Sequence, residues 1–230
     1  MVLGLFTHRG PVGQYAAGQT LGYMLLWLAT PLGAALFPRF SAMHAHQEAE
    51  RARKAVMEAA ARLWTVLLVG ASVVAAVSPW AARWVYGDAF VQAGFWMRWF
   101  AYAAVWAGMG ALVGALASAW GFQGWQARLL WATLPIAVLL YGMARKEGVM
   151  GVGLVAILVQ WGLLAALWIR LARSGLVHAG WFVRASMLGW TLWALAAWAP
   201  MELRLLLPVL AAAGCGVLRV GMLKPWEGLR

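Results

Sequence analysis

The apolar stretch at residues 149–171 reads VMGVGLVAILVQWGLLAALWIRL. A helix needs about 20 predominantly apolar residues to cross the roughly 30 Å hydrocarbon core of a bilayer, and this stretch exceeds that length. Its single charged residue, Arg170, lies next to its end. Comparable runs recur along the chain. We expect spans at residues 13–37, 63–86, 95–120, 125–144, 149–171, 181–199 and 203–222.

Backbone chemistry selects helices for these spans. Inside lipid every N–H and C=O group must be hydrogen-bonded within the protein, which only helices and closed barrels achieve. Barrel strands alternate apolar and polar residues, whereas these runs are long and continuous. The sequence therefore predicts an all-α fold, a polytopic membrane bundle of about seven transmembrane helices.

The composition agrees with a bilayer as solvent. Of the 230 residues, 64% are hydrophobic and 11% are charged, whereas soluble domains carry roughly 25% charged residues. The net charge of +11 does not indicate a nucleic-acid partner, because most basic residues lie in short loops rather than along one exposed face. The single cysteine, Cys215, excludes a disulfide framework and CxxC chemistry.

The basic residues divide unevenly between the two sides that alternating spans create. The positive-inside rule places the richer side in the cytoplasm, so we expect an extracytoplasmic N-terminus and a cytoplasmic C-terminus. Twelve of the 18 Lys and Arg residues fall on the richer side, namely Arg39, Arg51, Arg53, Lys54, Arg62, Arg128, Arg170, Arg173, Arg184, Arg219, Lys224 and Arg230. The other six are Arg9, Arg83, Arg98, Arg145, Lys146 and Arg204.

The longest polar segment, residues 39–62, is rich in Ala, Glu, Arg and Lys and contains no Pro or Gly. This composition predicts a cytoplasmic helix that continues into the second span. Two interpretations remain for it. The helix lies along the inner membrane surface, where anionic headgroups attract its cations, or it is a solvated connector.

Glycine and tryptophan patterns predict how the spans pack and where they end. Gly110 and Gly114 form a GxxxG pattern, which allows two helices to approach closely. Tryptophans near span ends are expected to anchor the helices in the headgroup layer. These are Trp80, Trp84, Trp96, Trp99, Trp120, Trp125, Trp181 and Trp198.

Four short motifs together carry a resemblance to a known family. The first span opens with VGQYAA (12–17) and closes with ALFPRFS (35–41), YGDAF (86–90) follows the second span, and GVMGVG (148–153) opens the fifth. Their order and spacing resemble those of the polysaccharide and O-antigen type of lipid-linked oligosaccharide flippases. This family belongs to the superfamily that also holds the lipid II flippases and the multidrug and toxin extruders.

The resemblance implies the C-terminal lobe of a two-lobe transporter in the bacterial inner membrane. Residues 1–12 would then be the extracytoplasmic end of a truncated preceding helix, 13–173 the five-helix lobe with a cytoplasmic loop at 39–62, and 174–230 two additional helices with a short tail. The resemblance also implies partners. These are membrane lipids, a lipid-linked (undecaprenyl-diphosphate) oligosaccharide, an N-terminal lobe from the same gene or a separate chain, and a glycan polymerase or glycosyltransferases.

Polar residues on one face of the first span are candidates for lining a substrate cavity. Tyr15, Gln19, Tyr23 and Thr30 fall within about 80° around a helix that turns 100° per residue. Polar residues inside a membrane mark transport pathways, which in paired-lobe transporters run between the lobes. The alternative is polar packing between helices of one lobe.

A lipid-linked glycan carries a pyrophosphate, which calls for Arg or Lys donors or helix N-termini. Arg39 and Arg98 are the nearest candidates for phosphate contact. The alternative for Arg39 is a stop signal at the membrane edge, and for Arg98 a side chain that reaches outward from the start of the third span.

Two other functions compete with flipping. A cation-coupled multidrug antiporter needs a titratable group within the membrane, but the acidic residues all lie in loops or near span ends, and Gln160 at mid-span is neutral and expected to form an interhelical hydrogen bond. A non-transporting scaffold of a glycan-assembly complex needs no cavity. We expect no enzyme activity, metal site or cofactor, because catalytic and nucleotide-binding motifs are missing and the HxH at His44 and His46 is too small a ligand set.

Overall fold

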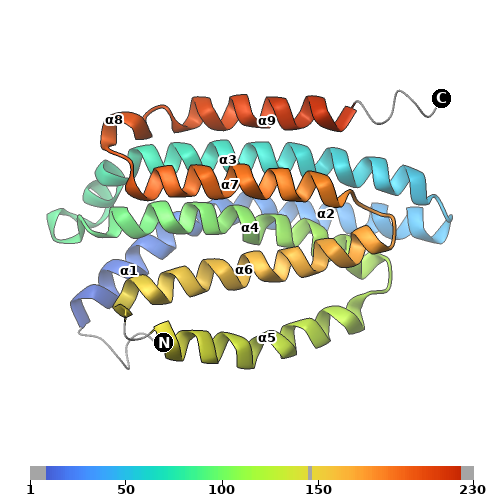
Figure 1. Ribbon diagram of the computed structural model, residues 1–230, viewed down its shortest axis with the longest axis horizontal. Helices are drawn as coiled ribbons and strands as arrows, with labels where there is room; N and C mark the ends of the chain where they lie inside the picture. The colour runs from blue at the N-terminus through green and yellow to red at the C-terminus, as the bar shows by residue number, and fades with distance from the viewer. Residues whose placement is uncertain (1–8, 145–146, 224–230) are drawn as a thin grey trace.

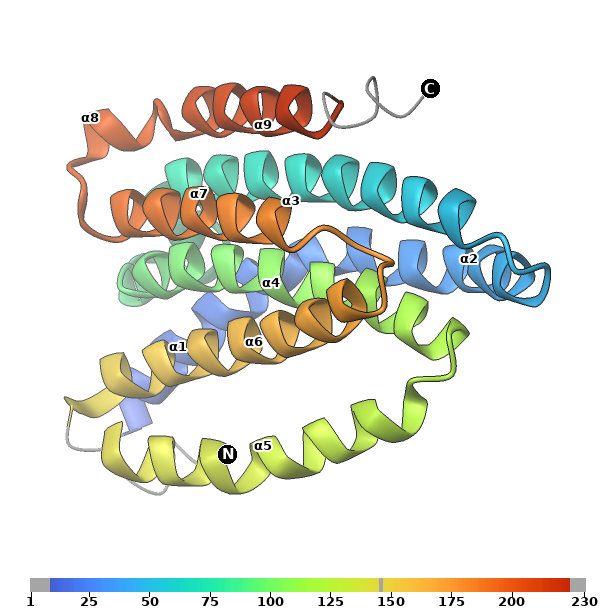
Figure 2. The same ribbon diagram turned by 45° about the vertical axis from the view of Figure 1, so that its right-hand side comes forward.

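The computed structural model describes residues 9–144 and 147–223, and these form helices without any strand. Figures 1 and 2 show the helices running roughly side by side. In chain order they are α1 (Arg9–Gly22), η2 (Tyr23–Leu25), α2 (Leu26–Ala45), α3 (Ala49–Tyr86), η3 (Asp88–Phe90), α4 (Ala93–Ala119), α5 (Gln123–Ala144), α6 (Gly148–Arg173), α7 (Ala179–Trp198), α8 (Met201–Arg204) and α9 (Leu207–Leu223).

The predicted all-α bundle is confirmed, and each of the seven predicted spans lies on a helix. Five helices in the described part are long and apolar enough to cross a membrane, and they occupy Val12–Ala45, Ala49–Tyr86, Ala93–Ala119, Gln123–Ala144 and Met150–Arg173. The chain is thus a multi-pass membrane protein in its helical architecture. The predicted spans at 181–199 and 203–222 lie on α7, α8 and α9, which fall outside these five.

Helix α4 lies at the centre of the bundle and packs against α1, α2, α3, α6 and α7. Its large side chains Trp99, Phe100, Tyr102 and Trp106 are almost completely buried. Lipid tails are as apolar as the protein interior, so close van der Waals packing rather than exclusion of water holds such helices together.

Two glycines let α1 approach the backbone of α4. A Cβ atom at Gly18 would lie 2.8 Å from the amide nitrogen of Met97, and one at Gly22 would lie 2.8 Å from the carbonyl oxygen of Met97. No real Cβ tolerates these distances. The first span therefore requires glycine at both positions to pack on α4.

Helices α2 and α3 form a hairpin over the predicted polar segment 39–62. Only residues 46–48 connect the two helices, and Gln47 adopts the left-handed conformation (φ 57°) that reverses the chain. Helix α3 has 38 residues, which corresponds to about 57 Å, far more than the hydrocarbon core. The prediction of a helix that continues into the second span is confirmed from Ala49 onward, whereas residues 39–45 continue α2, and the segment is not a separate surface helix.

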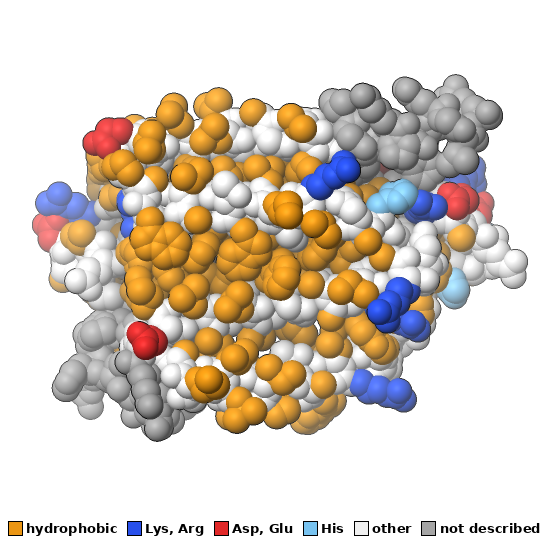
Figure 3. All heavy atoms as spheres, viewed as in Figure 1, with side chains coloured by type: hydrophobic (Ala, Val, Ile, Leu, Met, Phe, Trp, Pro, Cys, Tyr) orange, Lys and Arg blue, Asp and Glu red, His pale blue; other side chains and the backbone are white. Residues whose placement is uncertain are grey.

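The basic residues gather at the two ends of the bundle, as the alternation of spans predicted. The α2–α3 turn, the α4–α5 turn and the α6–α7 turn lie at one end, which is on the right in Figure 1. Figure 3 shows most Lys and Arg side chains of that face at this end, with an apolar surface between the ends. Arg145, Lys146, Lys224 and Arg230 lie outside the described residues.

Tryptophans divide between the core and the rim. Trp80, Trp84 and Trp198 are exposed, with 89% of Trp84 accessible, as the anchoring prediction requires. Three others are core residues and contradict that prediction, because aromatic rings of neighbouring helices pack against them. They are Trp96, Trp99 and Trp181.

Candidate functional site

The first span is bent at a 3₁₀ turn, η2, which separates α1 from α2 (Figure 2). A 3₁₀ helix turns 120° per residue instead of 100°, so its three residues rotate the later side chains by about 60° relative to a uniform helix. Thr30 is exposed and its hydroxyl donates a 2.6 Å hydrogen bond to the carbonyl of Leu26. The Thr30 hydroxyl therefore donates within its own helix and not to the other three cavity candidates.

Tyr23 is the centre of a polar cluster within the bundle. The side-chain amide of Gln160 in α6 donates a 2.6 Å hydrogen bond to the Tyr23 hydroxyl, and the Gln19 side chain interacts with the same hydroxyl. Tyr141 of α5 lies near enough to interact electrostatically with both Tyr15 and Tyr23. We call Tyr15, Gln19, Tyr23, Tyr141 and Gln160 the tyrosine–glutamine cluster.

The cluster rests on α4 through aromatic packing. The Tyr15 ring packs edge-on against Trp96 and Phe100, with centroids 5.2 and 5.0 Å apart, and the Tyr23 ring lies 5.2 Å from Phe100. Tyr15 is buried, whereas Gln19 and Tyr23 are partly exposed. The predicted interhelical hydrogen bond of Gln160 is confirmed. The Oε1 atom of Gln160 is buried and has no partner among the described residues.

Gln14 joins two of the sequence motifs, a role that the sequence did not reveal. Its side-chain oxygen accepts a 2.9 Å hydrogen bond from the Ala93 amide at the start of α4, and its side-chain nitrogen donates to the Ala89 carbonyl. The turn at Ala89 follows Gly87, whose φ of 83° favours glycine. The VGQYAA and YGDAF stretches are therefore neighbours in space, and Gln14 fastens α1 to the α3–α4 turn.

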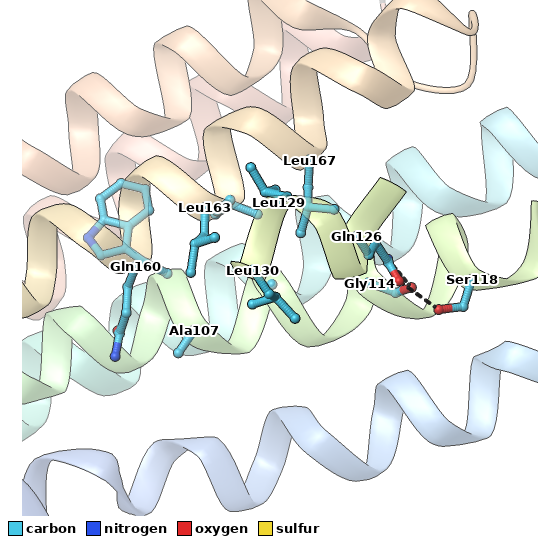
Figure 4. Close-up of a pocket in the computed structure, with 12 residues that line it drawn as sticks. Ala107, Gly114, Ser118, Gln126, Leu129, Leu130, Gln160, Leu163 and Leu167 are labelled. Atoms are coloured by element: carbon cyan, nitrogen blue, oxygen red, sulfur yellow. Dashed lines mark hydrogen bonds between the residues drawn. The ribbon is translucent and has the colours of Figure 1, made fainter. Parts of the chain in front are cut away.

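A pocket of about 450 Å³ lies between α4, α5 and α6. Figure 4 shows leucines from α5 and α6 along it, with Gln126 at one end and Gln160 at the other. Gln126 donates a 3.0 Å hydrogen bond to the Gly114 carbonyl and accepts one of 3.1 Å from Ser118. A Cβ at Gly110 would meet no atom within 4 Å. Gly110 and Gly114 line this pocket, so the close helix contact predicted at these two glycines is wrong, whereas at the neighbouring Gly108 a Cβ would lie 2.8 Å from that of Ala29 in α2.

The two predicted phosphate contacts lie at opposite ends of the bundle. Arg39 is exposed on α2 and lines a surface hollow of about 340 Å³ with Arg51, Lys54 and Glu58. Arg98 is only 8% exposed, so it does not reach outward. Arg39 and Arg98 therefore do not form one site, and neither of them joins Thr30.

Arg98 faces α3 rather than the tyrosine–glutamine cluster. One turn earlier, Gly94 abuts the Ser78 carbonyl of α3, and one turn later the Tyr102 hydroxyl lies 3.0 Å from the Ser72 hydroxyl of the same helix. The Tyr15 ring packs on a different side of α4. Any ligand of Arg98 therefore binds apart from the cluster.

Charged groups in the described part stay near the ends of the helices. The acidic residues lie on the α2–α3 hairpin, in η3, before α6 and on α8, and no three His, Cys, Asp or Glu side chains of the described residues gather into a metal-binding group. At the hairpin end, a nitrogen of the Arg53 guanidinium lies 2.9 Å from Nε2 of His178. Burial lowers the pKa of His178, and the charge of Arg53 lowers it further, whereas Glu50 raises it.

No family model, curated protein or solved structure matches this chain.

Proposed function

We propose that this chain is the C-terminal lobe of a bacterial inner-membrane transporter that flips an undecaprenyl-diphosphate-linked oligosaccharide. The observation that carries the proposal is the tyrosine–glutamine cluster, which places hydroxyl and amide groups within an otherwise apolar bundle. Such groups both donate and accept hydrogen bonds, as recognition of a sugar requires. Polar groups are costly in lipid and are a sign of a pathway.

The second support is the way the first span is built. A 3₁₀ turn at Tyr23–Leu25 and the helix-internal prolines Pro31 and Pro38 weaken its regular hydrogen bonding. Breaks of this kind in spanning helices are typical of transporter sites. In the proposed cycle a preceding lobe supplies the other wall, the lipid tail stays in the bilayer, and the glycan passes between the lobes.

A non-transporting scaffold is the second candidate, and one observation favours it. The Tyr23–Gln160 hydrogen bond joins two helices of the same lobe, which is the pattern of polar packing rather than of a vacant site. A proton- or sodium-coupled drug antiporter has less support, because the acidic residues of the described part lie near the helix ends.

Complementation of a flippase-deficient strain tests the proposal. The gene, with any in-frame upstream sequence, is expressed as the wild type, as Gln19→Leu with Tyr23→Phe, and as the control Thr30→Val, which removes a hydroxyl that donates within its own helix. We expect wild type and control to restore surface glycan and the double variant to lose it at an unchanged membrane level. Full export by the double variant contradicts the assignment, and drug resistance that needs an ion gradient supports the antiporter.

A further inference from the structure

Arg98 is a buried cation without a counter-charge. Its side chain lies within the packed interface of α3 and α4, and its guanidinium carbon lies 5.3 Å from the centroid of the Phe95 ring. Its Nε atom is buried and unbonded, and no ion pair of the described residues includes it. Removing a charge from water without an ionic partner costs several kcal/mol.

A second arginine approaches from the connection between α7 and α9. The Nε atom of Arg204 in α8 is also buried and unbonded, and α8 packs against α3, the helix that Arg98 faces. The positive charge of Arg204 acts repulsively on Arg98. Burial lowers the pKa of Arg204, and Glu202 raises it. Glu202 is exposed and forms no ion pair with either arginine in the described part of the chain. Two converging cations with open donors are the arrangement that an anion would stabilise.

The depth of the two arginines identifies the class of anion. Trp84 near the end of α3 and Trp198 at the end of α7 are exposed at the same end of the bundle, where amphipathic rings mark the headgroup layer. Phosphate is the common anion of that layer, and the planar guanidinium donates two parallel hydrogen bonds to it.

We propose that Arg98 and Arg204 together bind one phosphate group, of a lipid headgroup or of a free phosphate, between α4 and α8. This site is separate from the tyrosine–glutamine cluster and does not depend on the proposed transport. The bound phosphate neutralises the pair and ties the α7–α9 connection to the centre of the bundle.

The full chain, purified in phosphate-free dodecyl maltoside, allows the ligand sources to be separated. Thermal unfolding is followed with added dioleoylphosphatidylglycerol, with dioleoylglycerol, which has the same tails without phosphate, and with inorganic phosphate. We expect the phospholipid to raise the unfolding midpoint and dioleoylglycerol to leave it unchanged. A rise with inorganic phosphate alone also supports the site and identifies a soluble anion as its ligand. No rise with either phosphate compound overturns the proposal.

Variants test whether the two arginines are the site. Arg98→Gln and Arg204→Gln should each weaken phosphate-dependent stabilisation by about tenfold in the concentration required, because each removes charge-assisted hydrogen bonds. The control is Arg83→Gln at the same end, whose guanidinium is exposed and paired with Asp88. Arg204→Gln lies on the short helix α8 and keeps the test valid if Arg98→Gln fails to fold. An equal response in Arg83→Gln and Arg204→Gln overturns the assignment.

Discussion

The side-chain amide of Gln160 in α6 donates a 2.6 Å hydrogen bond to the hydroxyl of Tyr23, 137 residues earlier in the chain. This bond links the bent first span to α6 across the central helix region, where few other polar groups are available. The same two side chains are the best-defined part of the candidate site, so their energetics can be measured without knowing the substrate.

Tyr23→Phe should destabilise the protein by about 1 kcal/mol, because it leaves the partly buried amide of Gln160 without its acceptor. The measurement is thermal unfolding of the purified chain in detergent. Gln160→Leu removes the donor, and the double variant should cost clearly less than the sum of the single variants, since both remove one interaction. Additive losses would show that the bond contributes nothing.

Gly18→Ala should destabilise the bundle by about 1–3 kcal/mol, because its Cβ would collide with the backbone of α4 and force α1 away. Gly110→Ala is the matched control, since a Cβ there meets nothing within 4 Å and alanine favours helix. The unfolding midpoint and the yield in the membrane fraction distinguish them. Equal effects of the two substitutions would contradict the close packing of α1 on α4.

Stability should fall as the pH drops through the range just below 6.5, the usual pKa of histidine. Burial and Arg53 lower the pKa of His178 in the folded protein, so the unfolded chain binds a proton that the folded chain resists. The contribution of His178 to the free energy of unfolding is complete above pH 6.5, and it is lost as the pH falls toward the lower pKa of the folded state. His178→Gln should flatten the profile of unfolding midpoint against pH. Arg51→Gln, which removes a nearby exposed cation, should leave the profile unchanged.

Sequence patterns predicted the fold and part of the candidate site. Long apolar runs determine helices because lipid offers the backbone no hydrogen bonds, so each predicted span falls on a helix. Tyr15, Gln19 and Tyr23 meet in one cluster as the stripe predicted, whereas the Thr30 hydroxyl bonds the Leu26 carbonyl of its own helix, a local bond that residue spacing does not reveal. Arg204 was missed for a different reason. Its proximity to Arg98 arises from tertiary folding of segments about a hundred residues apart.

Helix α5 should be the first spanning helix to open. None of its residues is buried, and its less exposed polar contacts with α4 are those of Gln126, which bonds the Gly114 carbonyl and the Ser118 hydroxyl. Local opening costs least where few contacts must break. Gln126→Ala should therefore speed hydrogen exchange along α5 by about tenfold, the factor that corresponds to losing hydrogen bonds worth about 1.4 kcal/mol.

The control is Gln123→Ala, which removes only an exposed 3.3 Å hydrogen bond to the Ser118 carbonyl. Exchange in α4 should not change in either variant, because α4 is held from several sides. If the rate of hydrogen exchange along α5 is the same in Gln126→Ala and Gln123→Ala, apolar contact with α6 holds this helix in place, and the hydrogen bonds of Gln126 do not.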